Sequence, residues 1–388
     1  MNNASQEKQL QSLVNANSEA NRSKWALEAK KQGKKVIGIG CSYVPVEVVY
    51  AAGMLPWRIT GSWTSDVSPK AAVHRPMGTD PFYTHILDAR LKGDLDFLDG
   101  VIFTSLDDDM RRLYDVWVYA HNTAFDHIMF LPHHAREAAQ VRFADEIANL
   151  IKGLEKFGGK KITKTALLNA IKEYNRMRDL LHKLYELRKR DEPAVNGAEV
   201  LGITTGAQVM PADLFNKELE SLLPYLEGRV APGVKSGKKN IRLMVSSDGL
   251  DDPEFIKIIE NAGDIVVMDD LNTGSRWFWL NVKMGDAKKD PVNALSWRYL
   301  NRPACPRMGN WNEQIEQAID WAREYKVDGV VDFTYINDYP RQFRVPLFRQ
   351  ALEEAKIPVL SITRDYPVTG AAQLRTRFEA YTEMLVGV

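Results

Sequence analysis

The sequence predicts an α/β protein built on two parallel sheets, and two observations lead to this prediction. Short apolar runs rich in Val, Ile and Phe alternate with amphipathic helical stretches along both halves of the 388-residue chain. This alternation is typical of parallel strands joined by crossover helices. Between the halves lies a long stretch with helical periodicity. We therefore expect a helical N-terminal arm (1–30), a first α/β domain (31–140), a helical region with a linker (141–238) and a second α/β domain (239–388).

The first half contains three predicted strands, KKVIGIG (34–40), DGVIFTS (99–105) and HIMFLP (127–132), bounded by Gly, Asp and Pro. Between the first two, VPVEVVYAAG (44–53) predicts a helix, because Pro45 suits a first turn and Gly53 suits a helix end.

The middle region predicts two helices, at 144–159 and 163–191, with Thr163 as the cap of the second. The following stretch, 227–239, has the Gly, Pro and Lys content of a linker.

The second half repeats the strand pattern four times. The predicted strands are 240–247, 264–270, 328–335 and 357–365, and the predicted helices between them are 251–263, 312–326 and 344–356.

Composition excludes several classes of protein. Lys plus Arg and Asp plus Glu both number 51, so the chain lacks the basic excess of a nucleic-acid-binding protein. No apolar run approaches the roughly 18–20 residues of a membrane span. Two cysteines, Cys41 and Cys305, are too few for a disulfide framework or a metal site built on cysteine. Together with a polar N-terminus, this predicts a protein of the reducing cytoplasm.

The stretch GIGCSYVPVE (38–47) resembles a dinucleotide-binding turn only in part. Gly38 and Gly40 fit, but Tyr43 stands where a third glycine would let helix and strand pack closely. Cys41 is either a buried small residue or a thiolate favoured by the following helix N-terminus. Glu47 either complements the helix dipole in the first turn or acts as a base facing a crevice.

Acidic residues stand at two places where strands and helices meet. Asp80 precedes Pro81, where a helix begins, and Asp107 begins an Asp triplet after the strand 99–105. Such carboxylates cap helices, bind metals or perform acid–base chemistry. Arg111, Arg112 and Arg276 follow strand ends, where a guanidinium clamps phosphate or carboxylate or pairs with a nearby aspartate.

These stretches together resemble one family, the 2-hydroxyacyl-CoA dehydratases and the related ATP-dependent benzoyl-CoA reductases. The resemblance begins in GCSYVPVEVVYAAGMLPWRI and continues through LDFLDGVIF, MRRLYDVW, LLNAIKEYNRMRDLL and DDPEFIKIIENAG. It ends in MDDLNTGSRWF, VDGVV and IPVLSITRDYPVTGAAQLRTRFEAYTEML, so it covers nearly the whole chain after about residue 30.

The resemblance implies two flavodoxin-like or Rossmann-like α/β domains with helical additions, pairing with a related subunit. Each family subunit usually holds a 4Fe–4S cluster through three cysteines in the crevice between its domains. A separate ATP-dependent activator supplies one electron to the complex, which acts on an acyl-CoA thioester.

Here the three cysteine positions of the family fall on Asp80, Asp107 and Asn337. Oxygen ligands suit hard cations or water, whereas thiolates suit iron–sulfur clusters. We therefore expect no 4Fe–4S ligands in this chain and a cluster in a cysteine-bearing partner subunit. We also expect Asp80, Asp107 and Asn337 to converge. A proton, a cation or an arginine must then offset the repulsion of the two carboxylates, and Arg111, Arg112 and Arg276 are the candidate arginines.

The residues leave three functions open. The chain is a cluster-free subunit that completes an acyl-CoA pocket, an enzyme with changed, non-redox chemistry, or a non-enzymatic assembly protein. In the second case Asp80, Asp107, Asn337 and Glu47 are the candidate catalytic residues. Tyr43, Arg111 and Arg276 are the candidate substrate-binding residues in either enzymatic case.

Overall fold

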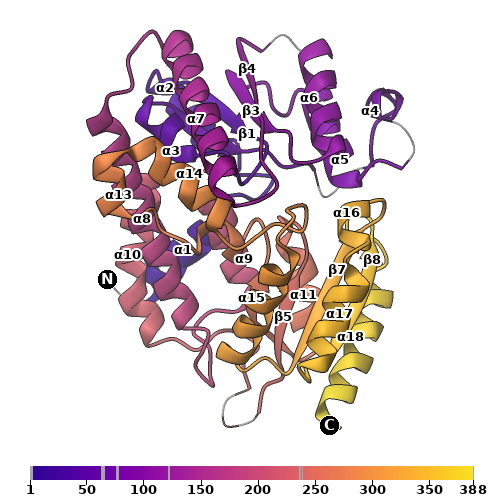
Figure 1. Cartoon of the computed structure of the whole chain (residues 1–388). Coiled ribbons are helices and arrows are strands. Elements are labelled where there is room, and N and C mark those ends of the chain that lie inside the picture. Colours follow the sequence, from indigo (N-terminus) through magenta and orange to yellow (C-terminus); the bar gives the residue numbers. More distant parts are fainter. Residues whose placement is uncertain are drawn as a thin grey trace.

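The chain forms two four-stranded sheets in which all neighbouring strands run parallel (Figure 1). The computed structural model describes residues 3–62, 66–75, 78–120, 123–235, 237 and 239–387. The first sheet has the order β2-β1-β3-β4 and the second the order β6-β5-β7-β8. The two orders are the same when each sheet is numbered from its own first strand. The predicted α/β fold with two parallel-sheet domains is confirmed.

The eight strands are short and mostly buried. They are β1 (Val36–Ile39), β2 (Leu55–Arg58), β3 (Gly100–Thr104), β4 (Phe125–Met129), β5 (Arg242–Ser246), β6 (Ile265–Asp270), β7 (Gly329–Tyr335) and β8 (Val359–Arg364). Six of them lie within stretches predicted as strands, and β4 overlaps the predicted strand 127–132 but begins two residues earlier. Strand β2 was not predicted, because it has only four residues and contains Pro56. Proline is compatible with β2 because this strand is at the edge of its sheet.

Ten helices lie in the first 230 residues of the described chain. They are α1 (Asn3–Val14), α2 (Lys24–Lys31), α3 (Val46–Ala51), α4 (Pro69–His74), α5 (Pro81–Leu91), α6 (Asp108–Ala120), α7 (Glu137–Gly158), α8 (Lys164–Glu186), α9 (Gly197–Ala207) and α10 (Ala212–Glu227). Thr163 caps α8 as predicted, since its hydroxyl accepts a hydrogen bond from the Ala166 amide at 3.1 Å.

Eight more helices follow in the second part of the described chain. They are α11 (Pro253–Glu260), α12 (Ser275–Phe278), α13 (Met284–Lys289), α14 (Pro291–Asn301), α15 (Trp311–Glu324), α16 (Tyr339–Gln342), α17 (Val345–Glu354) and α18 (Ala371–Val386). Helix α14 packs against α7 and α8, so this part of the chain crosses back to the helical region (Figure 1).

The helical region contacts both sheets, through α7 against β4 and through α9 against β6. Helix α9 is buried along its whole length and contacts α1, α11 and β6. Its N-terminus is closed by a capping box, in which Asn196 and Glu199 each accept a hydrogen bond from the other's backbone amide. None of the helices in the described ranges is both long and apolar enough to cross a bilayer. The domain bounds themselves stay a prediction, and residues 236 and 238 of the predicted linker lie outside the described chain.

Candidate functional site

A small cavity of about 30 Å³ lies where the carboxyl ends of strands from both sheets meet. Residues 40–42 and Arg58 border it from β1 and β2, and Leu106 follows β3. Asp248 follows β5, and Tyr335 ends β7. The edge formed by strand carboxyl ends is where open α/β sheets bind their ligands, and here two such edges share one cavity.

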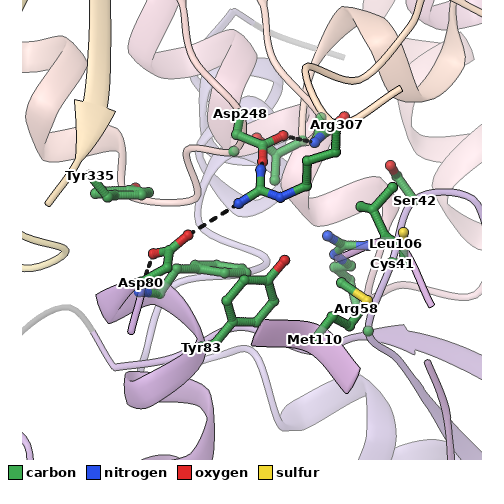
Figure 2. A pocket seen from close by; sticks show the side chains of 15 residues that line it. Cys41, Ser42, Arg58, Asp80, Tyr83, Leu106, Met110, Asp248, Arg307 and Tyr335 are labelled. Atoms are coloured by element: carbon green, nitrogen blue, oxygen red, sulfur yellow. Dashed lines mark hydrogen bonds and ion pairs between the residues drawn. The ribbon is translucent and has the colours of Figure 1, made fainter. Parts of the chain in front are cut away.

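The guanidinium of Arg307 contacts four carboxylates at this cavity. Its Nη2 lies 3.3 Å from Asp80 Oδ2 and 3.0 Å from Asp338 Oδ1. Its Nε pairs with Asp107 and its Nη1 with Asp248. Figure 2 shows Arg307 between Asp80 and Asp248. Because Arg307 follows α14 in a loop, this one side chain joins the first sheet's edge to the second's.

Three of these carboxylates also begin helices, which explains their fixed positions. Asp80 accepts a hydrogen bond from the Phe82 amide at 2.9 Å and caps α5, where Pro81 occupies the first turn. Asp107 accepts one from the Met110 amide at 2.7 Å at the start of α6. Asp338 accepts one from the Arg341 amide at 3.2 Å at the start of α16. Helix capping and the contact with Arg307 therefore use the same side chains.

Burial governs the electrostatics of this cluster. The side chain of Asp80 is almost fully buried, and burial raises its pKa well above the ordinary value, with a further contribution from the charge of Asp338. The positive charge of Arg307 opposes this rise but does not cancel it. Burial alone would lower the pKa of Arg307, yet the surrounding carboxylates raise it well above its ordinary value. One guanidinium cannot neutralise four carboxylates, so a protonated Asp80 relieves their repulsion.

Asn337 lies beside the cluster rather than in contact with Arg307. Its Nδ2 is 3.4 Å from the carbonyl oxygen of Thr79, the residue before Asp80. Its φ of 65° is in the left-handed region, which asparagine adopts more readily than most residues. The structure thus brings Asp80, Asp107 and the Asn337–Asp338 turn together from three separate elements.

The arginine at the centre is not one that the sequence analysis named. Arg111 and Arg112 are exposed on α6 and pair with Asp108. Arg276 is fully buried, donates to Asp270 Oδ1 at 2.9 Å and to backbone carbonyls, and does not line the cavity. The expectation that one of these three would neutralise the cluster was wrong, because Arg307 does so.

Glu47 lies in a separate, fully buried network. Its carboxylate pairs with Arg178 of α8 and accepts a hydrogen bond from the Tyr299 hydroxyl of α14 at 2.7 Å. Burial would raise the pKa of Glu47, but the charges of Arg178 and Arg298 hold it below its ordinary value. Glu47 therefore connects α3 to the helical region and does not line the cavity.

Tyr43 also connects distant segments. Its hydroxyl accepts a hydrogen bond from the Cys305 amide at 3.2 Å, and the Arg302 guanidinium lies 3.9 Å from the centre of its ring. Burial raises the pKa of Tyr43 to about 12. Cys41 lines the cavity, whereas Cys305 is fully buried with its sulfur 3.3 Å from Asp248 Oδ1.

Two residues at the cavity, Asp248 and Arg307, were not predicted from the sequence, for different reasons. Asp248 comes directly after the predicted strand 240–247, and Asp107 comes shortly after the predicted strand 99–105. The rule that singled out acidic residues after strands would therefore have found Asp248 as well. Arg307 lies in the loop RPACPRMGN. That loop has no periodicity and no motif, so nothing in the sequence indicates where its side chain points.

A family model described as "2-hydroxyglutaryl-CoA dehydratase, D-component" matches residues 41–385. The chain belongs to this family. It is 24% identical over 367 residues to the (R)-phenyllactyl-CoA dehydratase beta subunit of Clostridium sporogenes, covering 94% of this chain and 96% of that protein.

Two further relatives cover most of the chain. One is a subunit of the benzoyl-CoA reductase of Thauera aromatica, 27% identical over 84% of this chain and 85% of that protein. The other is the beta subunit of the (R)-2-hydroxyglutaryl-CoA dehydratase of Acidaminococcus fermentans, 28% identical over 92% of this chain and 94% of that protein. The resemblance on which the sequence analysis relied is confirmed, and all three relatives are named as subunits.

The residues present do not fit the iron–sulfur cluster that the family resemblance implies. Thiolates are the usual ligands of such clusters, whereas Asp80, Asp107 and the Asn337–Asp338 turn offer only oxygen and amide groups. Arg307 places a guanidinium between them, and a cation repels a metal ion. Among the described residues, no group of three or more His, Cys, Asp or Glu side chains is arranged to hold a metal ion.

Proposed function

We propose that this chain is a subunit of a cytoplasmic dehydratase or reductase complex that acts on an acyl-CoA thioester. In this proposal the chain holds no cluster, and a related cysteine-bearing subunit holds the redox centre. An ATP-dependent activator supplies that partner with its electron. The observation that supports the cluster-free role is the contact of Arg307 with carboxylates at Asp80, Asp107 and Asp338.

The replacement of the cluster by an ion-pair network has a physical rationale. Deleting thiolates from a buried site leaves a polar hollow that destabilises the fold unless other groups are paired there. An arginine with several carboxylates fills the site with hydrogen-bonded groups and joins both sheets. The chain can thus keep the family's shape, and with it the surfaces that a partner and an acyl-CoA would contact.

A surface beside this site supports a partner subunit. Four apolar side chains around α16 and the start of α17 are well exposed: Ile336 by 44%, Tyr339 by 48%, Phe343 by 78% and Leu347 by 50%. We call them the α16–α17 patch. Since the relatives are named as subunits, the occupant that fits this patch is the related subunit, whose apolar surface would cover it.

Iron analysis tests the cluster-free role directly. The chain purified anaerobically on its own should be colourless, with neither iron nor acid-labile sulfide in stoichiometric amount. The complex co-purified with a cysteine-bearing paralogue should be brown, and its iron should follow the partner's concentration. A brown chain with near-stoichiometric iron would overturn the proposal.

A second function, acid–base chemistry without redox, is favoured by one observation. Asp80 lines the cavity and burial raises its pKa, so its carboxyl group is a candidate proton donor. In this case the chain alone converts an acyl-CoA, and Asp80→Asn abolishes the conversion. If the complex converts the acyl-CoA and the isolated chain does not, the chain acts as the cluster-free subunit, which is the first function.

A further inference from the structure

A cleft of about 230 Å³ lies between the N-terminal arm and the start of α11, and we call it the arm cleft. Residues of the segment 14–19, which follows α1, form one wall, and residues of the segment 251–257 form another. Thr205 of α9 also lines it, and α9 contacts both α1 and α11 (Figure 1). The arm cleft is separate from the cavity at Arg307, because the two have no lining residue in common.

Acidic side chains dominate the charge of the arm cleft. Four carboxylates and one ammonium group line it, from Glu19, Asp251, Asp252, Glu254 and Lys257. Lys257 pairs with Glu254 at 2.6 Å, so the other three carboxylates leave an excess of negative charge. Such a lining attracts cations and repels anions.

The remaining polar groups of the arm cleft accept hydrogen bonds more readily than they donate them. Asn17 is 3% exposed, lines the cleft, and has a buried Oδ1 without a hydrogen-bond partner among the described residues. The hydroxyl of Ser18 already donates to the Asn15 carbonyl at 2.9 Å, and that of Thr205 to the Leu201 carbonyl at 2.8 Å. A ligand that donates hydrogen bonds would therefore satisfy this lining, and an unpartnered buried oxygen is otherwise destabilising.

The carboxylates are held in place by groups of the protein itself. The Tyr366 hydroxyl donates to Asp251 Oδ2 at 2.8 Å, and the Ser62 hydroxyl donates to Glu19 Oε1 at 2.9 Å. Asp252 caps α11. A site whose acceptors are fixed beforehand loses less side-chain entropy when a ligand binds.

Burial makes the ionised form of Asp252 costly, and a cation would offset this cost. Asp252 is almost fully buried, and burial raises its pKa, although the amide of Glu254 and the charge of Arg364 oppose the rise. A positively charged ligand beside Asp252 would favour the carboxylate form further.

The size of the arm cleft fits an organic cation better than a bare metal ion. No three His, Cys, Asp or Glu side chains of the described chain are arranged to hold a metal ion. A single water molecule needs only about 10–15 Å³ of such space, so 230 Å³ also admits a short alkyl chain. Val14 and Pro253 supply apolar surface for that chain.

We propose that the arm cleft binds a small aliphatic amine, with its ammonium group on Asn17 and the carboxylates and its alkyl chain against Val14 and Pro253. An ammonium group has three donors and no acceptor, which matches this lining. A diamine fits best, because acidic groups stand on both walls. The bound amine joins the N-terminal arm to α11. This proposal does not depend on the proposed function, because it concerns other residues and is tested on the isolated chain.

Isothermal titration calorimetry with the isolated full-length chain tests the site at constant ionic strength. The probe is 1,4-diaminobutane, and 1,4-butanediol is its uncharged counterpart of the same length. We expect the diamine to bind at least about 30-fold more tightly than the diol, because charge-assisted hydrogen bonds are lost with the ammonium groups.

A variant of Asp252 assigns the binding to the arm cleft. Asp252→Asn keeps the helix cap but removes the charge, and it should weaken diamine binding by about tenfold or more. Asp290→Asn is the matched control, since Asp290 is exposed, precedes a proline and caps α14. It makes the same change at another helix start and should leave binding unchanged.

A variant of Asn17 separates a lost site from a lost fold. Asn17→Leu removes the unpartnered oxygen and keeps much of the side chain's shape. It should therefore weaken diamine binding by about tenfold or more without lowering the melting temperature of the free chain.

Four results would overturn the proposal. They are a wild-type chain that does not bind the diamine, a diol that binds as tightly as the diamine, wild-type affinity in either Asp252→Asn or Asn17→Leu, and a lowered melting temperature of free Asn17→Leu. Tighter binding of magnesium chloride than of the diamine would overturn the ligand class.

Discussion

Three carboxylates at the cavity have two roles, because each caps a helix and also contacts Arg307. This explains why their chemistry differs from that of isolated carboxylates. Asp80 caps a helix and also contacts Arg307, so its position is fixed by backbone and side-chain bonds at once. Burial then makes its ionised form costly, and the carboxylate of Asp338 adds repulsion. Asp80 is therefore part of an internal ion-pair network rather than an isolated carboxylate.

Asp80→Asn should stabilise the chain at alkaline pH. Above about pH 4 the unfolded chain ionises Asp80, while the fold retains the proton because the pKa is raised. The folded state then binds more protons, so the free energy of unfolding falls as pH rises from about 4 toward that raised pKa. Asparagine keeps the cap but does not ionise.

Urea denaturation at pH 4 and pH 8 measures this effect. We expect the variant to be more stable than wild type by about 1–3 kcal/mol at pH 8 and nearly equal at pH 4. The control Asp108→Asn, on the exposed start of α6, should change stability by no more than about 0.5 kcal/mol. A loss of stability in Asp80→Asn at pH 8 would mean that Arg307 requires an ionised Asp80.

Cys41 should tolerate replacement by serine. It lies in the turn between β1 and α3 and is buried against the cavity, so its size and position account for it without a reaction. We expect Cys41→Ser to keep the activity of the complex within about tenfold, or ~1.4 kcal/mol in barrier. A loss of several orders of magnitude in a variant that still folds would show that the thiol takes part in chemistry.

At the scale of elements, close packing of backbones holds the helical region together. Helix α9 is buried throughout and lies against α1, and a side chain at Gly202 would place a Cβ 2.3 Å from the carbonyl oxygen of Val14. The glycine is thus required by the approach of the two helices, not by its backbone angles. The N-terminal arm is therefore an integral layer of the fold.

Gly202→Ala should separate α1 from α9. Because the obstacle is backbone, the helices must move, and we expect a loss of about 1–3 kcal/mol in the free energy of unfolding. Gly285→Ala in α13 is the control, since its added Cβ has nothing within 4 Å, and it should be neutral or slightly stabilising. Equal stabilities of the two variants in urea denaturation would contradict this account of α9.

The whole molecule places two sheets of the same strand order with their carboxyl edges on one cavity. Arg307 connects the two edges, and Tyr43 and Glu47 connect the first sheet to the segments around Cys305 and α14. Such buried polar contacts fix the relative orientation of the sheets. A partner would thus meet a preformed surface that includes the α16–α17 patch.

Phe343→Asp should weaken assembly with the related subunit. Phe343 is the most exposed member of the α16–α17 patch, so the variant should fold normally while burying a charge at the interface. Co-expression followed by size-exclusion chromatography with light scattering measures the complex. Leu27→Asp, at an exposed position of α2, is the control and should assemble as wild type. Unchanged assembly of Phe343→Asp would exclude the patch as the contact surface.

The sequence by itself determined the alternation of strands and helices, the cap at Thr163, and the family. These features are local: periodicity, turn residues and motif order are written along the chain. The family resemblance also indicated that Asp80, Asp107 and Asn337 belong together, because they fall on the three cysteine positions of the family.

Only the tertiary structure decided which cation meets these residues. Arg307 lies in an irregular loop about 200 residues beyond Asp107, and its side chain is oriented by packing between sheets, which no local pattern encodes. Whether a buried guanidinium is paired depends on what the rest of the fold brings within about 4 Å of it, so pairing and its absence are properties of the folded molecule alone.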